Sequence, residues 1–128
     1  MNKTIEQRRL DFIETELGYF IEDPSRRSVD QTDNCYYRHP DDGRPCLIGK
    51  QIADSDYSPG LEGESVGYSD VFPLLSKEVQ ELEEHFLNTL QEFHDDLDNW
   101  TTTGLSELGK KKLNQIKRVF CGISTDNI

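Results

Sequence analysis

The chain has 128 residues, of which 34% are hydrophobic and 30% are charged, and its formal net charge is −11. This length is typical of one domain, so we expect a single domain over residues 1–128. Six Phe, five Tyr and one Trp argue against wholesale disorder. No apolar run approaches the roughly 18 residues that span a bilayer, and residues 1–10 lack the apolar stretch of a secretory signal. Three cysteines suit a reducing compartment. We therefore expect a cytoplasmic protein without membrane association.

The negative charge is concentrated in the middle of the chain. Residues 51–100 carry one base, Lys77, against 13 acidic residues, whereas residues 101–128 carry five bases against two acids. Phosphates would be repelled by such a middle segment, which disfavours direct nucleic-acid binding. A basic protein surface would be attracted to it. The same charges also fit a solvated helix face that keeps the protein soluble.

Residues 4–21 are predicted to form the first helix, because apolar side chains recur there at helical spacing. Thr4 is expected to cap its beginning, with Gln7 as the partner in a capping box. Asp23 precedes Pro24, and a residue before proline avoids the helical conformation. The helix should therefore end near this pair.

Residues 35–52 are predicted to form a β-hairpin. Asp42 and Gly43 are a strong signal for a two-residue turn of the primed type. With these two residues in the turn, Pro40 opposes Pro45 at a pair that needs no N–H group. A longer loop bounded by the two prolines is the alternative. The irregular stretch over residues 54–72 that follows is long enough to be either a functional loop or an ordered crossing loop.

Residues 74–100 are predicted to form one long acidic helix with an apolar stripe. The stripe consists of Leu75, Val79, Leu82, Phe86, Leu90, Phe93, Leu97 and Trp100. We expect Phe86, Leu90, Phe93 and Leu97 to form its core seam.

Residues 105–120 are predicted to form a basic C-terminal helix, followed by a loose tail over residues 122–128. The residues expected to face inward are Leu108, Leu113, Ile116, Val119 and Phe120. Those expected to face outward are Lys110, Lys111, Lys112, Lys117 and Arg118. The cations are expected to neutralise the acidic helix, and contact with phosphates is the alternative. Helices together with one hairpin give a predicted α+β fold class.

Thiol chemistry on the hairpin is one candidate function. In the proposed register His39 faces Cys46, and a neighbouring histidine can lower the pKa of a thiol. A nucleophilic cysteine needs such a base and an orienting carboxylate. The alternative function is therefore a thiol- or metal-dependent enzyme that uses Cys35, His39, Cys46 and His94. The same contact is also an ordinary cross-strand pair.

The spacing of the potential metal ligands argues against a metal site. Cys35 and His39 would lie about 13 Å apart along a strand. His85 and His94 are nine residues apart, so on one helix they would point in opposite directions. The chain also has no CxxC or HxxxH pair of the kind that structural zinc recruits. We expect no metal and no cofactor.

Three segments together resemble a group of small uncharacterised proteins of bacteria and their phages. They are Asp23-Pro24-Ser25-Arg26-Arg27, then Cys35-Tyr36-Tyr37-Arg38 with Asp42-Gly43-Arg44-Pro45-Cys46-Leu47-Ile48-Gly49, and finally Phe93-His94-Asp95. The resemblance covers residues 10–97. It implies an intracellular protein of phage or mobile-element origin and no particular mechanism.

The leading hypothesis is a small acidic interaction protein without enzymatic activity. Its long helix would bind a basic surface on a partner protein through Glu81, Glu84, Glu92, Asp95 and Asp98. If the phage resemblance holds, the partner is a host nucleic-acid-binding protein, and the chain is an inhibitor that presents a DNA-like array of charge.

Overall fold

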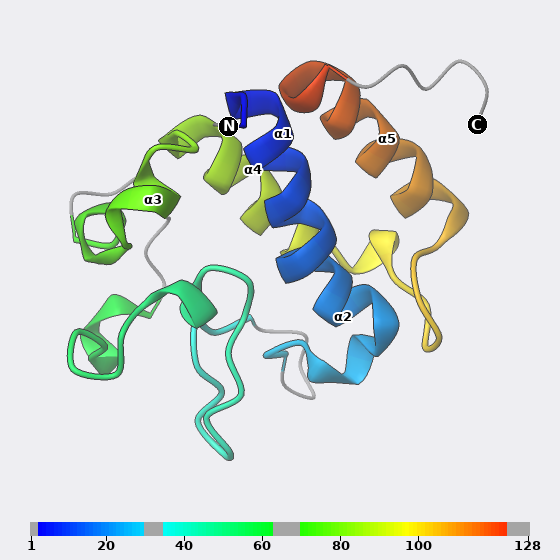
Figure 1. Ribbon diagram of the computed structural model, residues 1–128. Helices are drawn as coiled ribbons and strands as arrows, with labels where there is room; N and C mark the ends of the chain where they lie inside the picture. Colours follow the sequence, from blue (N-terminus) through cyan, green and yellow to red (C-terminus); the bar gives the residue numbers. More distant parts are fainter. Residues whose placement is uncertain (1–2, 30–34, 63–69, 123–128) are drawn as a thin grey trace. The chain divides into compact units, whose positions relative to one another are not determined.

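The computed structural model describes residues 3–29, 35–62 and 70–122. Figure 1 shows that the described chain is built from helices joined by irregular segments. It divides into two compact units, one of Met1–Ser25 with Asp96–Ile128 (unit 1) and one of Arg26–Asp95 (unit 2). The single domain expected over residues 1–128 stays a prediction. The expected loose tail lies outside the described residues, apart from Gly122.

Unit 1 begins with the predicted N-terminal helical segment. It consists of α1 (Ile5–Phe12), a π-helical turn η1 (Ile13–Leu17) and α2 (Gly18–Glu22). The Thr4 hydroxyl accepts a hydrogen bond from the backbone N–H of Gln7, and the Gln7 side chain accepts one from the N–H of Thr4. The capping box is therefore confirmed. Asp23 adopts an extended conformation after Glu22, so the predicted end is also confirmed, and the short turn η2 (Pro24–Arg26) follows.

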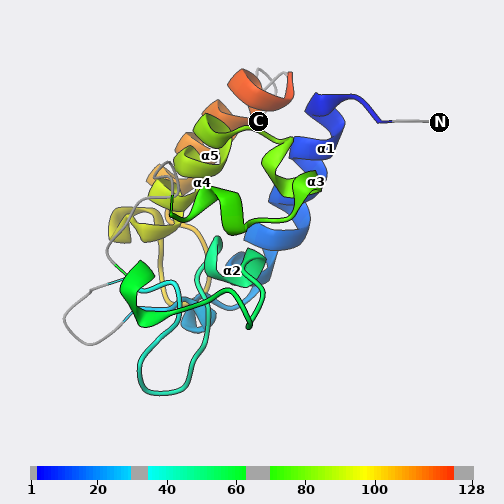
Figure 2. The same cartoon turned by 90° about the vertical axis from the view of Figure 1, so that its left-hand side faces the viewer.

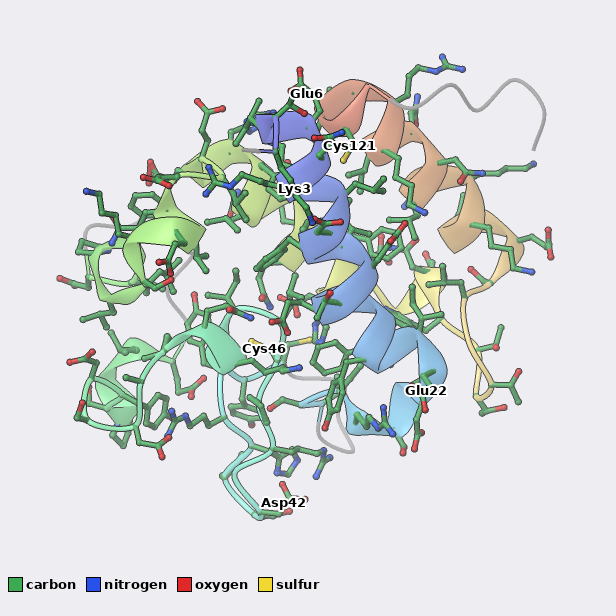
Figure 3. All side chains as sticks on the ribbon, viewed as in Figure 1. Lys3, Glu6, Glu22, Asp42, Cys46 and Cys121 are labelled. Carbon is green, nitrogen blue, oxygen red and sulfur yellow. The ribbon has the colours of Figure 1, made fainter. Side chains whose placement is uncertain are left out.

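The C-terminal helix of unit 1 is α5 (Glu107–Cys121), which confirms the predicted C-terminal helix. The Ser106 hydroxyl caps its first turn, and Gly122 ends it with a φ of 66°. It runs antiparallel to α1, so that Glu6 and Cys121 lie near each other in Figure 3. The Arg9 guanidinium stacks on the ring of Phe120. It also donates a hydrogen bond to the backbone carbonyl oxygen of Phe120 at 3.2 Å.

The expected inward face of α5 is partly wrong. Leu113 is buried and Phe120 is half-buried, but Leu108 and Val119 are 45% and 69% exposed. The reason is a rotation of the helix about its axis, because Gly109 lies against the backbone of Asn99 at close range. This contact turns Leu108 and Val119 toward solvent.

The predicted hairpin over residues 35–52 is wrong, and with it the α+β fold class, because the described residues contain no β-strand. They contain only isolated bridges, one of which pairs Arg38 with Pro45. The N–H of His39 donates to the carbonyl oxygen of Arg44, and the N–H of Cys46 donates to that of Tyr37. The pairing is thus shifted by two residues from the predicted register, and the connection is a four-residue loop with a positive φ of 75° at Gly43.

One long-range contact stops the bridge from extending into strands. The N–H groups of Tyr37 and Arg38 both donate to the carboxylate of Glu62 at 2.7 and 3.1 Å, so they are unavailable to a neighbouring strand. The chain then coils into the short turn η3 (Gly49–Gln51).

The single helix predicted for residues 74–100 is also wrong. Four shorter elements take its place: η5 (Phe72–Leu74), α3 (Lys77–Gln80), α4 (Glu84–Asp95) and η6 (Leu97–Asn99). Figure 2 shows α3 and α4 as separate helices. Glu83 between them has a φ of 82°, which is incompatible with a right-handed helix. After α4, Asp96 leaves the helical conformation and caps η6, and from this residue on the chain belongs to unit 1.

Helix α4 supplies much of the buried surface of unit 2. Phe86 and Leu90 are fully buried and Phe93 is 4% exposed, which confirms three members of the predicted core seam. Leu97 is 39% exposed and lies in η6, so its assignment to the same seam is wrong. The break of the helix before this residue explains the difference.

The stretch over residues 54–72 is partly ordered. The turn η4 (Pro59–Leu61) buries Leu61, while residues 63–69 lie outside the described residues. Glu62 links this loop to the segment before it. Its carboxylate accepts hydrogen bonds from the N–H groups of Tyr37 and Arg38 and from the hydroxyl of Tyr57. The Arg38 guanidinium stacks over the Tyr57 ring at 4.5 Å and forms an ion pair with Asp54. This part is therefore an ordered crossing loop.

Candidate functional site

The acidic residues predicted to bind a partner are placed mainly on and next to α4. Glu81 lies in the turn before the helix, and Glu84 and Glu92 lie on it; all three are exposed. Glu84, Asn88 and Glu92 follow each other at intervals of four residues, so they form one row along the helix surface. We call these three residues the acidic ridge. The Asn88 amide donates to the Glu92 carboxylate at 3.2 Å, which helps to fix this side chain.

Two of the five predicted binding residues do not belong to this surface. The Asp95 carboxylate accepts a hydrogen bond from the Gln91 amide and lies 2.9 Å from Nδ1 of His94, so it holds the end of α4 together. Asp98 is exposed, but it lies in η6 of unit 1. The structure therefore places Glu84 and Glu92 on α4 and Glu81 in the turn before it, all within unit 2.

The charge around the acidic ridge is strongly one-sided. Residues 70–95 carry seven acidic side chains and one lysine, Lys77. Glu78 and Glu83 are exposed beside the ridge residues. Two carboxylates on one helix, with further carboxylates nearby in the chain, produce a negative potential that reaches beyond contact distance. Such a surface can attract and orient a basic partner.

Two residues of the alternative chemical site, Cys46 and His94, belong to one largely buried hydrogen-bond network. The Cys46 thiol donates to the side-chain oxygen of Gln91 at 3.5 Å and accepts from the backbone N–H of Gly49 at 3.3 Å. The same Gln91 oxygen accepts from the N–H of Ile48 at 3.0 Å. Through Gln91 the network continues to Asp95, and from there to His94. It ties the segment after the turn to helix α4.

His39 does not oppose Cys46 as predicted. Its own backbone pairs with Arg44, and its Nδ1 atom accepts a hydrogen bond from the N–H of Asp41 at 3.1 Å. The ring is buried and lies edge-on to Tyr36. Figure 3 shows Asp42 at the tip of this turn and Cys46 at its base. His39 therefore stabilises the turn from within.

The environment of Cys46 suits a structural thiol. Complete burial raises its pKa far above the ordinary value, with the negative charge of Asp95 as a smaller contribution in the same direction. A thiol of this kind stays protonated at neutral pH, whereas the nucleophile is the thiolate. The geometry thus provides no activated cysteine at this position. Burial likewise raises the pKa of Cys121.

The remaining candidate ligands do not form a metal centre. Among the residues that the structure describes, no three His, Cys, Asp or Glu side chains are grouped so that they could hold a metal ion. Cys35 donates to the backbone oxygen of Asp95 at 3.8 Å, and the three cysteines are thiols rather than disulfide partners. His94 is fully buried, whereas His85 is exposed.

Two organising residues, Gln91 and Glu62, were not identified from the sequence. Gln91 lies four residues before Asp95 and four after the buried Leu87. Helical spacing could therefore have predicted that its side chain lies on the inward face of α4. Glu62 had no such signal, because the N–H groups that it accepts belong to residues 24 and 25 positions earlier in the chain.

A scan against protein-family models and searches of curated proteins and of solved structures found no match to this chain. The phage or mobile-element origin therefore stays a prediction from the three motifs. Within the described residues, no helix has the length and apolar character needed to cross a membrane.

Proposed function

We propose that this chain is an acidic interaction protein that binds a basic surface of a partner protein through Glu81 and the acidic ridge. The observation that supports the proposal is the pair of exposed carboxylates on α4, Glu84 and Glu92, on a helix of unit 2 whose opposite face is buried. Because the buried face fixes the helix, its charges lose little conformational freedom when a partner docks.

The kind of partner follows from the number and spacing of the charges. A single exposed ion pair contributes less than about 1 kcal/mol, so several must act together. Glu84 and Glu92 are separated by about 12 Å along the helix axis, since each residue rises 1.5 Å. A nucleic-acid-binding protein offers repeated cations in its binding groove. We therefore propose a partner of this class, for which the chain would act as a DNA-mimicking inhibitor in the cytoplasm of a bacterial host.

The test compares two variants that each remove three negative charges. In the first, Glu81, Glu84 and Glu92 are changed to Gln; in the second, the exposed Asp41, Asp56 and Asp70 are changed to Asn. Each variant and the parent are immobilised and used to capture proteins from a bacterial extract. We expect the parent and the Asp variant to retain the same basic protein, and the Glu variant to lose it.

Two further measurements determine the nature of the contact. Capture should weaken steeply with salt, because screening shortens the reach of exposed charges. Double-stranded DNA should displace the partner if the ridge occupies its nucleic-acid site. Equal capture by the two variants would show that the ridge is a solvated helix face and would contradict the proposal. Helical circular dichroism must be unchanged in both variants, since Glu84 also stabilises the first turn of α4.

A further inference from the structure

Helix α5 carries a basic row along one side of its surface. Lys110, Asn114 and Arg118 follow each other at intervals of four residues, with Lys110 and Arg118 exposed and Asn114 half-buried. Beside them the surface has a hollow of about 290 Å³ lined by Lys111, Asn114, Gln115 and Arg118. We call Lys110, Asn114 and Arg118 the basic row.

Beyond Arg118, on the side of α5 that faces away from Lys110, two apolar side chains are left in solvent. Leu108 is 45% exposed and Val119 is 69% exposed, although both had the spacing of inward-facing residues. Aliphatic side chains next to charges are typical of surfaces that bury a partner, since the charges orient the contact and the aliphatic groups stabilise it. The outer face of α5 therefore has the composition of a docking surface.

The basic row and the acidic ridge are complementary in order, spacing and charge. The row consists of a base, an Asn and a base, and the ridge of an acid, an Asn and an acid. In each, the two charged residues are eight positions apart on an α-helix. Both charged pairs are therefore separated by about 12 Å along the helix axis. Rows at intervals of four residues are the ridges that interdigitate when two helices pack in the common crossing geometry. In that arrangement Asn88 and Asn114 meet between the two ion pairs, where two amides can exchange hydrogen bonds.

We propose that α5 is the docking surface for the acidic ridge of a second copy of this chain. The inference goes beyond the proposed function, with which it shares only the ridge. Every copy carries both surfaces, so the contact is heterologous and repeats from one molecule to the next. Lys110 is paired with Glu107 at 3.3 Å, and the exposed Arg118 also has a contact within the chain. Exposed contacts of this kind are weak, so both can be exchanged for contacts with Glu84 and Glu92.

The salt concentration determines whether the local attraction exceeds the repulsion between two molecules of charge −11. At about 0.15 M salt the screening length is about 8 Å, so the repulsion between distant charges is reduced while contacting pairs still attract. At about 1 M it falls to about 3 Å and the pairs are weakened as well. Self-association should therefore occur near physiological salt and disappear at high salt.

Sedimentation equilibrium tests the proposal on the full chain, at concentrations up to about 1 mM because contacts of this kind are weak. At about 0.15 M salt the average mass of the parent should rise with concentration above the monomer's 14.8 kDa and return to it at about 1 M. The ridge variant Glu84→Lys with Glu92→Lys should stay monomeric. The row variant Lys110→Glu with Arg118→Glu should also stay monomeric.

Two combinations separate a specific contact from an effect of net charge. An equimolar mixture of the ridge variant and the row variant should associate although neither does so alone, because the retained surfaces are complementary and so are the two reversed ones. A chain with all four substitutions should associate again, because its charges are exchanged rather than removed. The control variant Asp41→Lys with Asp56→Lys, which has the same net charge as the ridge variant, should associate as the parent does.

A parent that stays at 14.8 kDa at every concentration would overturn the proposal. So would a folded four-fold variant that fails to associate, or a row variant that associates as strongly as the parent. The row variant keeps Glu81 and the acidic ridge, so it should still capture the basic partner of the proposed function. Loss of self-association with retained capture thus distinguishes the two proposals, and each can fail without the other.

Discussion

Gly109 packs so closely against the backbone of Asn99 that a Cβ atom at position 109 would lie 2.2 Å from the Asn99 carbonyl oxygen. The same oxygen accepts the N–H of Ser106 at 2.9 Å, and the Ser106 hydroxyl accepts the N–H of Gly109 at 3.0 Å. These contacts join η6 to the first turn of α5 within unit 1. Glycine is required here for close approach, since the atom that a side chain would meet belongs to the backbone and has little room to move.

Gly109→Ala should therefore destabilise the protein, even though alanine is the better helix former. Overpacking of this kind typically costs about 1–3 kcal/mol in the free energy of unfolding. Gly18→Ala is the matched control, because it lies in α2 and nothing lies within 4 Å of its added Cβ. There alanine should stabilise by about 0.5–1 kcal/mol. Urea unfolding followed by circular dichroism measures both, and effects of the same sign would contradict the described contact.

Truncating Phe86 or Phe93 in α4 should strongly destabilise the protein. Both are buried, so changing either to alanine should reduce the free energy of unfolding by about 3–5 kcal/mol. Leu97→Ala is the control, and it should cost much less because Leu97 is 39% exposed. The measurement is again denaturant unfolding. If the two Phe variants were as stable as the parent, the buried face of α4 would not be part of the core.

Replacing Glu83 with glycine should stabilise the folded protein. Its φ of 82° lies in the left-handed region, which costs a residue with a side chain about 1–2 kcal/mol and glycine very little. Glu83→Gly should therefore raise the free energy of unfolding by about 1 kcal/mol, less whatever the Glu83 side chain contributes. Glu83→Ala removes the same side chain but keeps the strain. A Glu83→Gly variant no more stable than Glu83→Ala would show that the turn between α3 and α4 is not strained.

The buried Cys46 thiol should make stability fall at alkaline pH. Burial raises the pKa of the Cys46 thiol well above its ordinary range, whereas in the unfolded chain it titrates near its usual value of about 8.5. Above that pH the unfolded state gives up this proton and the folded state keeps it. The stabilisation is therefore complete below about pH 8.5 and decreases as the pH rises further.

Cys46→Ala isolates this contribution. Between about pH 9 and 10.5 the free energy of unfolding of the parent should fall more steeply than that of the variant, by about 1.4 kcal/mol per pH unit. Denaturant unfolding at a series of pH values gives the two slopes. Alkylation of native protein at pH 8 should also leave Cys46 unmodified. Parallel slopes, or rapid alkylation of Cys46, would mean that the thiol is accessible to water.

The structural role of Glu62 illustrates what the sequence leaves undetermined. Its carboxylate accepts hydrogen bonds from the N–H groups of Tyr37 and Arg38 and from the Tyr57 hydroxyl. Burial, followed by the hydrogen bond to Glu62, raises the pKa of Tyr57 to about 12. Local propensity alone favoured a hairpin over residues 35–52, but the two-residue turn predicted at Asp42 and Gly43 is a four-residue loop over residues 40–43. A long-range acceptor then took the N–H groups that a strand would have needed.

The sequence by itself determined the helix ends that depend on neighbouring residues. Thr4 with Gln7 begins α1, Asp23 before Pro24 ends α2, and Gly122 ends α5. It also located the buried residues Phe86, Leu90 and Phe93, since helical periodicity reports one buried face. The concentration of acidic charge, from which the proposed function arises, is likewise a property of composition.

Only the tertiary structure decided where the periodic segments break and which way each helix is turned. The apolar repeat continues through Glu83 and Asp96, but backbone conformation at these two positions separates α3, α4 and η6. On α5 the close approach of Gly109 to Asn99 directs Leu108 into solvent, although spacing placed it inside. The physical reason is the same in both cases. Periodicity reports that a face is apolar, whereas contacts between residues distant in the chain determine which face is buried and for how many turns.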